Sequence, residues 1–124
     1  MPRVLIIDDE PPVRAVLRAA LEAAGHAVRE AADGAAGVAL YWRDPADVVV
    51  CDLILPGLDG LGAMRHLRRL DPGARLVAIT GGPTEPGERL SLGRGMGAVR
   101  LLRKPFRVEE AVAAVEEALA AAVG

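Results

Sequence analysis

Short apolar runs alternate along the chain with longer stretches in which apolar residues recur every three or four positions. Five short runs have the length and residue types of β-strands: Val4–Ile7, Ala27–Ala31, Ala46–Cys51, Leu76–Ile79 and Val99–Leu102. The third run is apolar apart from Asp47, a composition typical of a strand that is buried on both faces. The pattern therefore predicts five strands separated by helices.

The stretches between these runs have helical spacing and helical end signals. Pro11 and Pro12 begin the first helix, as proline does in a first turn, and Gly25 ends it as a C-cap glycine. Three further helices are predicted, over Ala35–Trp42, Leu61–Leu70 and Val108–Leu119. Residues 83–97 are rich in glycine and proline, so the helix expected there is short or frayed.

Strands that alternate with helices are the mark of βαβ units. The sequence therefore predicts an α/β fold with one five-stranded parallel sheet and helices on both of its faces. With 124 residues and 12.9 kDa, the chain has the size of a single domain, over residues 1–124. No internal repeat or linker divides it, and no output domain is expected in this chain.

Composition excludes several classes of protein. The single cysteine, Cys51, rules out a disulfide within the chain and is expected in the core, while His26 and His66 are expected on the surface. A net charge of −2 argues against direct binding of nucleic acid. No apolar run reaches the ~20 residues of a membrane span and no signal-peptide pattern is present, so a cytoplasmic location is expected.

Polar side chains follow four of the five predicted strands. They are the pair Asp8-Asp9, then Asp52, Thr80 and Lys104. In open parallel sheets, ligands bind beyond the carboxyl ends of the strands, so these side chains are expected to meet at one edge. Lys104 is the only lysine among 15 basic residues, which favours a role that arginine cannot fill.

Three carboxylates at one edge repel each other by about 4 kcal/mol per pair at ~4 Å and an effective dielectric constant near 20. One lysine does not offset that repulsion, so either some carboxyl groups stay protonated or a divalent cation lies among them. Mg²⁺ suits such oxygen ligands. Carboxylates, a hydroxyl group, an ammonium group and Mg²⁺ together are suited to phosphoryl transfer with an aspartate as the nucleophile.

Four motifs occur in order, each at the end of a predicted strand: Val4–Glu10 (VLIIDDE), Asp52–Gly60 (DLILPGLDG), Ile79–Gly81 (ITG) and Lys104–Phe106 (KPF). In this set and order the sequence resembles the receiver domains of two-component response regulators, over essentially the whole chain. The resemblance implies a flavodoxin-like doubly wound sheet with strand order 2-1-3-4-5.

The resemblance also implies a role for each polar residue of the site. Asp52 is the expected phosphoacceptor. Asp9 and Asp52 are expected to bind Mg²⁺ directly, together with the backbone carbonyl of Ile54, whereas Asp8 is expected to act through a metal-bound water.

Around the acceptor, the resemblance implies three groups that bind the phosphoryl oxygens. These are the Thr80 hydroxyl, the backbone amide of Gly81 and the Lys104 ammonium. The peptide bond between Lys104 and Pro105 is typically cis in this family, and proline is the residue that tolerates that isomer.

As a function, the resemblance implies a phosphorylation-activated receiver that signals by protein contact and is no enzyme beyond its own phosphorylation and autodephosphorylation. The expected phosphodonor is a sensor histidine kinase or a histidine phosphotransfer protein. The downstream protein is unknown, no membrane partner is expected, and a phosphorylation-linked dimer is compatible with this role. Two alternatives stay open: a small Mg²⁺-dependent phosphohydrolase that uses an aspartyl phosphate, and a phosphorylation-independent interaction module.

The sequence departs from the family pattern at two places. Leu101 stands where the last strand usually carries an aromatic residue, and residues 81–97 form a glycine- and proline-rich segment in the region that the family uses for output. We therefore expect phosphorylation to shift the conformation incompletely and a partner to finish ordering residues 81–97.

Overall fold

The structure, a computed structural model of the chain, describes residues 1–53, 60–80 and 100–121. Its strands are β1 (Arg3–Ile7), β2 (Ala27–Ala31), β3 (Val48–Asp52), β4 (Leu76–Thr80) and β5 (Arg100–Arg103). Its helices are α1 (Pro11–Ala23), α2 (Gly34–Arg43), α3 (Gly60–Leu70) and α5 (Val108–Ala120). The helix predicted within residues 83–97 lies outside the described residues.

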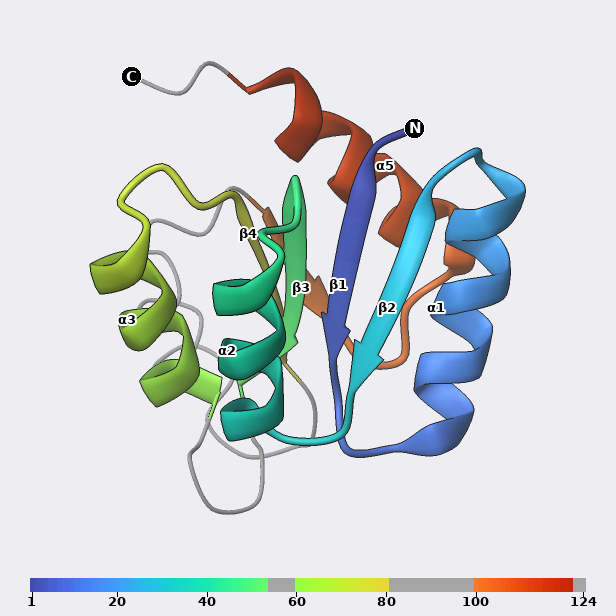
Figure 1. The fold of residues 1–124 in the computed structure, drawn as a ribbon. Helices are drawn as coiled ribbons and strands as arrows, with labels where there is room; N and C mark the ends of the chain where they lie inside the picture. The colour runs from blue at the N-terminus through green and yellow to red at the C-terminus, as the bar shows by residue number, and fades with distance from the viewer. Residues whose placement is uncertain (54–59, 81–99, 122–124) are drawn as a thin grey trace.

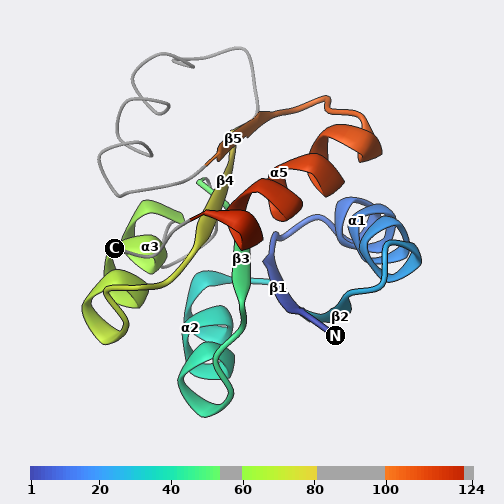
Figure 2. The same cartoon turned by 90° about the horizontal axis from the view of Figure 1, so that it is seen from above.

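One sheet joins the five strands in the order β2-β1-β3-β4-β5, and every neighbouring pair is parallel. Helices α1 and α5 cover one face of the sheet, and α2 and α3 cover the other (Figures 1 and 2). The predicted α/β fold and its strand order are therefore confirmed. No helix in the described part of the chain combines the length and the apolar character that a membrane crossing requires.

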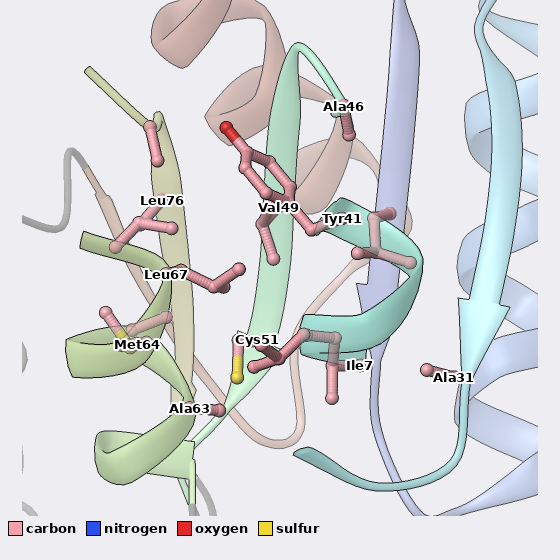
Figure 3. Close-up of a cluster of buried hydrophobic side chains, with 14 of the residues drawn as sticks. Ile7, Ala31, Tyr41, Ala46, Val49, Cys51, Ala63, Met64, Leu67 and Leu76 are labelled. Atoms are coloured by element: carbon pink, nitrogen blue, oxygen red, sulfur yellow. The ribbon is translucent and has the colours of Figure 1, made fainter. Parts of the chain in front are cut away.

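Alternation along the strands builds one core on each face of the sheet, because successive side chains point to opposite sides. In β1, Leu5 and Ile7 belong to the core under α2 and α3, whereas Val4 and Ile6 belong to the core under α1 and α5. Figure 3 shows the first of these cores, where Tyr41 of α2 and residues of α3 pack over the sheet. Burial on both faces explains why β1, β3 and β4 read as nearly continuous apolar runs.

The ends of several elements differ from the prediction by one or two residues. Strand β3 begins at Val48, two residues later than predicted, and the side chain of the preceding Asp47 accepts a hydrogen bond from the Arg3 N–H at 2.7 Å. Helix α2 begins at Gly34, one residue before its predicted start, and Asp33 caps it: the Asp33 Oδ1 accepts a hydrogen bond from the Ala36 N–H at 2.7 Å. Helix α3 begins at Gly60, also one residue before its predicted start.

Two predictions of residue placement are confirmed and one is wrong. Cys51 is fully buried and His66 is exposed, as predicted. His26 was predicted on the surface, but it is only 4% exposed. It follows α1, and its Nε2 lies 3.3 Å from Oε1 of Glu116 on α5. Sequence position alone did not show that α5 packs over this turn.

At Gly37, helix α2 comes close to the side chain of Ile7 in β1. A Cβ atom at this position would lie 2.7 Å from Cγ1 of the fully buried Ile7, and closer still to its Cδ1. We expect Gly37→Ala to lower the free energy of unfolding by roughly 1–3 kcal/mol because the side chain of Ile7 must move. Urea denaturation measures this change.

Ile7→Val removes the δ-methyl group that meets the added Cβ atom, so the double variant should recover part of the loss. Helix propensity alone predicts the opposite sign, since alanine favours a helix over glycine by about 1 kcal/mol. A Gly37→Ala variant as stable as the wild type would show that α2 does not lie this close to β1.

Candidate functional site

Three strand ends bring charged side chains together at the carboxyl edge of the sheet. Asp8 follows β1, Asp52 ends β3 and Lys104 follows β5. The Lys104 Nζ lies 2.9 Å from Oδ2 of Asp52, 3.2 Å from Oδ2 of Asp8 and 2.6 Å from Oε1 of Glu10. An ammonium group has three N–H donors, and here each has a carboxylate within reach.

The members of this cluster differ in their exposure to solvent. Asp8, Asp52 and Thr80 are buried, and the Lys104 side chain is 18% exposed. The neighbouring Asp9 and Glu10 are open to solvent, with 55% of the Glu10 side chain exposed. Buried carboxylates need a counter-ion, and in the described part of the chain Lys104 supplies it.

Backbone hydrogen bonds fix the positions of these residues. The Lys104 N–H donates to the Thr80 carbonyl at 2.8 Å, which continues the β4–β5 ladder to the site. The Asp8 N–H donates to the Ala31 carbonyl at 3.1 Å in the same way. The Lys104–Pro105 peptide bond is cis, as the family resemblance implied. The side chains of the cluster thus extend from a rigid sheet edge.

Gly60 is a site residue that the sequence reasoning missed. Its N–H donates to the Leu53 carbonyl at 3.2 Å, so α3 begins directly against the end of β3. A Cβ atom here would collide with the Asp52 carbonyl oxygen and lie 2.6 Å from the carbonyl carbon. Only glycine permits this approach beside Asp52. The sequence signal was its place at the end of the Asp52–Gly60 motif, but spacing alone could not show the close contact.

Burial and neighbouring charges shift two pKa values in the cluster. Burial is the largest effect on the carboxyl group of Asp8, and it raises the pKa. The hydrogen bond from the Glu10 N–H and the charge of the Lys104 ammonium lower the pKa, but they do not outweigh burial. For Lys104, burial lowers the pKa, but hydrogen bonds to Glu10 and Asp52 outweigh it, so the pKa is raised. Lys104 therefore keeps its positive charge throughout the neutral range.

The acidic side chains fit a hard divalent cation. Asp8, Asp9, Glu10 and Asp52 each offer an oxygen atom, and these atoms lie within 4.8 Å of one another. The Oδ2 of Asp8 is buried, and within the described residues its polar contact is the Lys104 ammonium at 3.2 Å. A ligand set made only of oxygens matches the preference of Mg²⁺.

The structure thus brings together most of the predicted site. Asp8, Asp9, Asp52 and Lys104 form one cluster, and Thr80 ends the strand between β3 and β5. Glu10 joins the cluster although the sequence reasoning gave it no role. The other two predicted site residues, Ile54 and Gly81, lie outside the described residues.

Residues 4–116 match the family described as response regulator receiver domain. The chain belongs to this family. It is thereby a module of two-component signal transduction, as the four motifs predicted. The relatives PilH, RpaA and CheY4, compared below, support neither a phosphohydrolase nor a phosphorylation-independent interaction module.

Two curated relatives illustrate the similarity. The receiver domain is 36% identical over 121 residues to protein PilH of Pseudomonas aeruginosa, covering 97% of this chain and 99% of PilH. It is 37% identical over 119 residues to the DNA-binding dual master transcriptional regulator RpaA of Synechocystis, covering 96% of this chain but 49% of RpaA. The chain thus spans about half the length of several regulators that it matches, RpaA and MprA among them.

Solved structures show the same fold. A response regulator receiver domain protein from Clostridium thermocellum matches with a TM-score of 0.89 and 25% identity, over 97% of this chain and 95% of that one. The chemotaxis protein CheY4 of Vibrio cholerae matches with a TM-score of 0.87 and 27% identity, over 96% of this chain and 99% of CheY4.

Replacing Lys104 tests the charge balance of the cluster. We expect Lys104→Met to lower the free energy of unfolding by roughly 2–4 kcal/mol at neutral pH without metal, because it removes the ammonium group that pairs with the buried carboxylates of Asp8 and Asp52. The loss should shrink as the pH falls, since a carboxyl group with a raised pKa becomes neutral on acidification. Urea denaturation between pH 5 and pH 8 measures both effects.

Glu10→Gln is the matched control, because it removes only the exposed partner of Lys104. Its effect should stay below about 1 kcal/mol, as for other exposed ion pairs. If Lys104→Met lowered the free energy of unfolding equally at pH 5 and at pH 8, the positive charge of Lys104 would not be what stabilises the buried carboxylates.

Proposed function

We propose that this receiver domain accepts a phosphoryl group on Asp52 and signals by protein contact. The expected donor is the phosphohistidine of a sensor histidine kinase or of a histidine phosphotransfer protein. The observation that supports this proposal best is the Lys104 ammonium, 2.9 Å from the buried Asp52 carboxylate and surrounded by acids that fit a divalent cation.

In this proposal Asp52 is the nucleophile. One of its carboxylate oxygens attacks phosphorus, the bond between phosphorus and the imidazole nitrogen breaks, and that nitrogen keeps the electron pair. The Lys104 ammonium donates a hydrogen bond to a phosphoryl oxygen in place of a carboxylate, and its positive charge offsets the negative charge of the phosphoryl oxygens. The Thr80 hydroxyl and the Gly81 amide donate to the remaining phosphoryl oxygens.

Asp9, Asp52 and the Ile54 carbonyl would hold Mg²⁺, with Asp8 acting through a water molecule. When bound, Mg²⁺ supplies positive charge that stabilises the phosphoryl oxygens. Glu10, within the same cluster, adds negative charge that attracts the cation and holds Lys104 in place before phosphorylation. The acids therefore favour binding of the cation before an anionic donor approaches.

Leu101 bears on how the domain responds. It is partly buried and packs against the core under α2 and α3. A leucine makes fewer contacts than the usual aromatic ring, so we propose that phosphorylation shifts the population incompletely and that a downstream protein completes the change. The identity of that protein and phosphorylation-linked dimerisation stay predictions.

An apolar hollow of about 740 Å³ adjoins the site and is suited to the donor protein. Pro12, Val13 and Val16 of α1 line one side, and Lys104, Pro105 and Phe106 line the other. Val16 is 51% exposed although it is apolar. A protein that brings a phosphohistidine to Asp52 must cover the rim of the site, so we propose that it contacts this hollow.

The phosphoacceptor is tested by intact mass. After incubation with acetyl phosphate and Mg²⁺, the wild type should gain the mass of one phosphoryl group and Asp52→Asn should gain none, because an amide is a poor nucleophile. Glu109→Gln, which removes an exposed carboxylate on α5, should gain the same mass as the wild type. An unchanged gain in Asp52→Asn would show that another residue is the acceptor.

The docking hollow is tested by comparing two donors. We expect Val16→Asp to slow phosphoryl transfer from a phosphorylated histidine phosphotransfer protein by about tenfold or more, because a charge in an apolar contact is costly. The rate with acetyl phosphate should not change. Phosphotransfer gels measure the first rate and intact mass the second.

Ala23→Asp places the same charge on an exposed position of α1 two turns away, and it should leave both rates unchanged. An equal loss with the two donors would mean that Val16 supports the site itself and is not a docking residue.

A further inference from the structure

Helices α2 and α3 lie side by side on one face of the sheet (Figures 1 and 2). A hollow of about 390 Å³ lies between them, lined by Ala35, Val38, Ala39 and Trp42 of α2 and by His66 and Leu70 of α3. We call this hollow and its rim on α3 the α2–α3 groove. It lies on the opposite face of the sheet from α1 and from the docking hollow described above.

The groove exposes the only tryptophan of the chain. Trp42 is 67% exposed, whereas the preceding Tyr41 is almost completely buried. The chain has only three aromatic residues, so one of its largest apolar side chains lies in solvent beside the partly exposed Leu70. Tryptophan is the residue most enriched at the centres of protein interfaces, because it buries a large apolar area at low entropic cost.

The rim of the groove on α3 is basic. A second hollow of about 390 Å³ shares His66 and Leu70 with the first and is also lined by Gly62, Arg65 and Arg69. Arg65 and Arg69 are exposed and one helical turn apart, so both guanidinium groups extend from the same side of α3. Among the described residues that line the two hollows there is no carboxylate.

These two arginines differ from several other arginines of the structure in their pairing with acids. Within the described residues, Arg65 and Arg69 have no ion-pair partner. By contrast, five arginines elsewhere pair with a carboxylate: Arg3, Arg14, Arg18, Arg29 and Arg100. The described residues therefore leave the positive charge beside the groove without an ion-pair partner.

We propose that the α2–α3 groove binds an acidic amphipathic helix of a partner protein. An apolar side chain of that helix would pack against Trp42 and Leu70, and carboxylates on its flank would pair with Arg65 and Arg69. A groove between two helices accepts a third helix through its apolar face, and charge complementarity sets the partner and its orientation. The groove is separate from Asp52, so this binding neither requires nor blocks phosphorylation.

Two other occupants fit the groove less well. A second copy of this chain, related by a twofold axis, would bring Arg65 and Arg69 against their own images, and like charges across an interface are unfavourable. A nucleic acid would need a broad cationic surface, whereas the hollow between the helices is lined mostly by apolar side chains and the chain carries a net charge of −2.

Trp42 itself reports binding, because it is the only tryptophan and lies in the groove. The probe is a synthetic amidated helical peptide of about four turns without aromatic residues, with leucine on one face and glutamate on both flanks. Its partner peptide has lysine in place of each glutamate. The glutamate peptide should shift the Trp42 emission to shorter wavelength in a saturable way, and the lysine peptide should not.

Charge-reversing variants show which residues are responsible. Arg65→Glu/Arg69→Glu should weaken binding of the glutamate peptide by about tenfold or more. The matched control, Arg103→Glu/Arg107→Glu, makes the same change in charge at two exposed positions on β5 and beside α5, and it should bind within about twofold of the wild type. Circular dichroism checks that each variant is folded.

Several outcomes would overturn the proposal. One is equal binding of the two peptides, and another is unchanged affinity in Arg65→Glu/Arg69→Glu. If oligothymidylate, and not the peptide, shifts the emission with the same dependence on arginine, the groove binds nucleic acid. If sedimentation shows a dimer that this variant dissociates, a second copy covers the groove. None of these measurements uses phosphorylation, so they leave the proposal for Asp52 untouched.

Discussion

The rest of the site depends on one interaction, the contact between the Lys104 ammonium and the buried carboxylates of Asp8 and Asp52. It joins the ends of β1, β3 and β5, which are distant in sequence. A buried carboxylate without a counter-ion destabilises a fold, and two side by side destabilise it more. The positive charge of Lys104 reduces the repulsion between these carboxylates but does not cancel their negative charge. The remaining negative charge favours binding of a divalent cation at this edge of the sheet.

The fold makes this arrangement possible through the close fit of its layers. The sheet is covered on both faces, so the strands stay in a fixed register and deliver their last residues to the same edge. Gly37 lets α2 approach β1, and Gly60 lets α3 start against the backbone of Asp52. The same two helices leave an apolar groove on their outer side. Helices α2 and α3 thus have two roles. Their inner side packs against the sheet and supports the site, and their outer side forms the proposed partner surface.

Much of this could be predicted from the sequence, and the reasons are physical. Continuous apolar runs reveal strands buried on both faces, and the rule that ligands meet the carboxyl ends of parallel strands locates Asp52 and Lys104 at one edge. The remainder depends on packing that a sequence pattern does not contain. Nothing in the spacing places Glu10 against Lys104, buries His26 under α5, or shows that Gly60 touches the backbone of β3. Each of these contacts joins two elements, and how closely those elements pack is determined only when the helices pack onto the sheet.

The raised pKa of Lys104 has a consequence for covalent chemistry at its amine. This is the only lysine of the chain, and an amine must lose its proton before it can attack an acyl group. The ion pairs that hold the ammonium in the cluster therefore also protect it from acylating reagents. A cation that draws the carboxylates away would weaken this protection. The reactivity of one amine would then report the electrostatic state of the whole site, with no other lysine to obscure the signal.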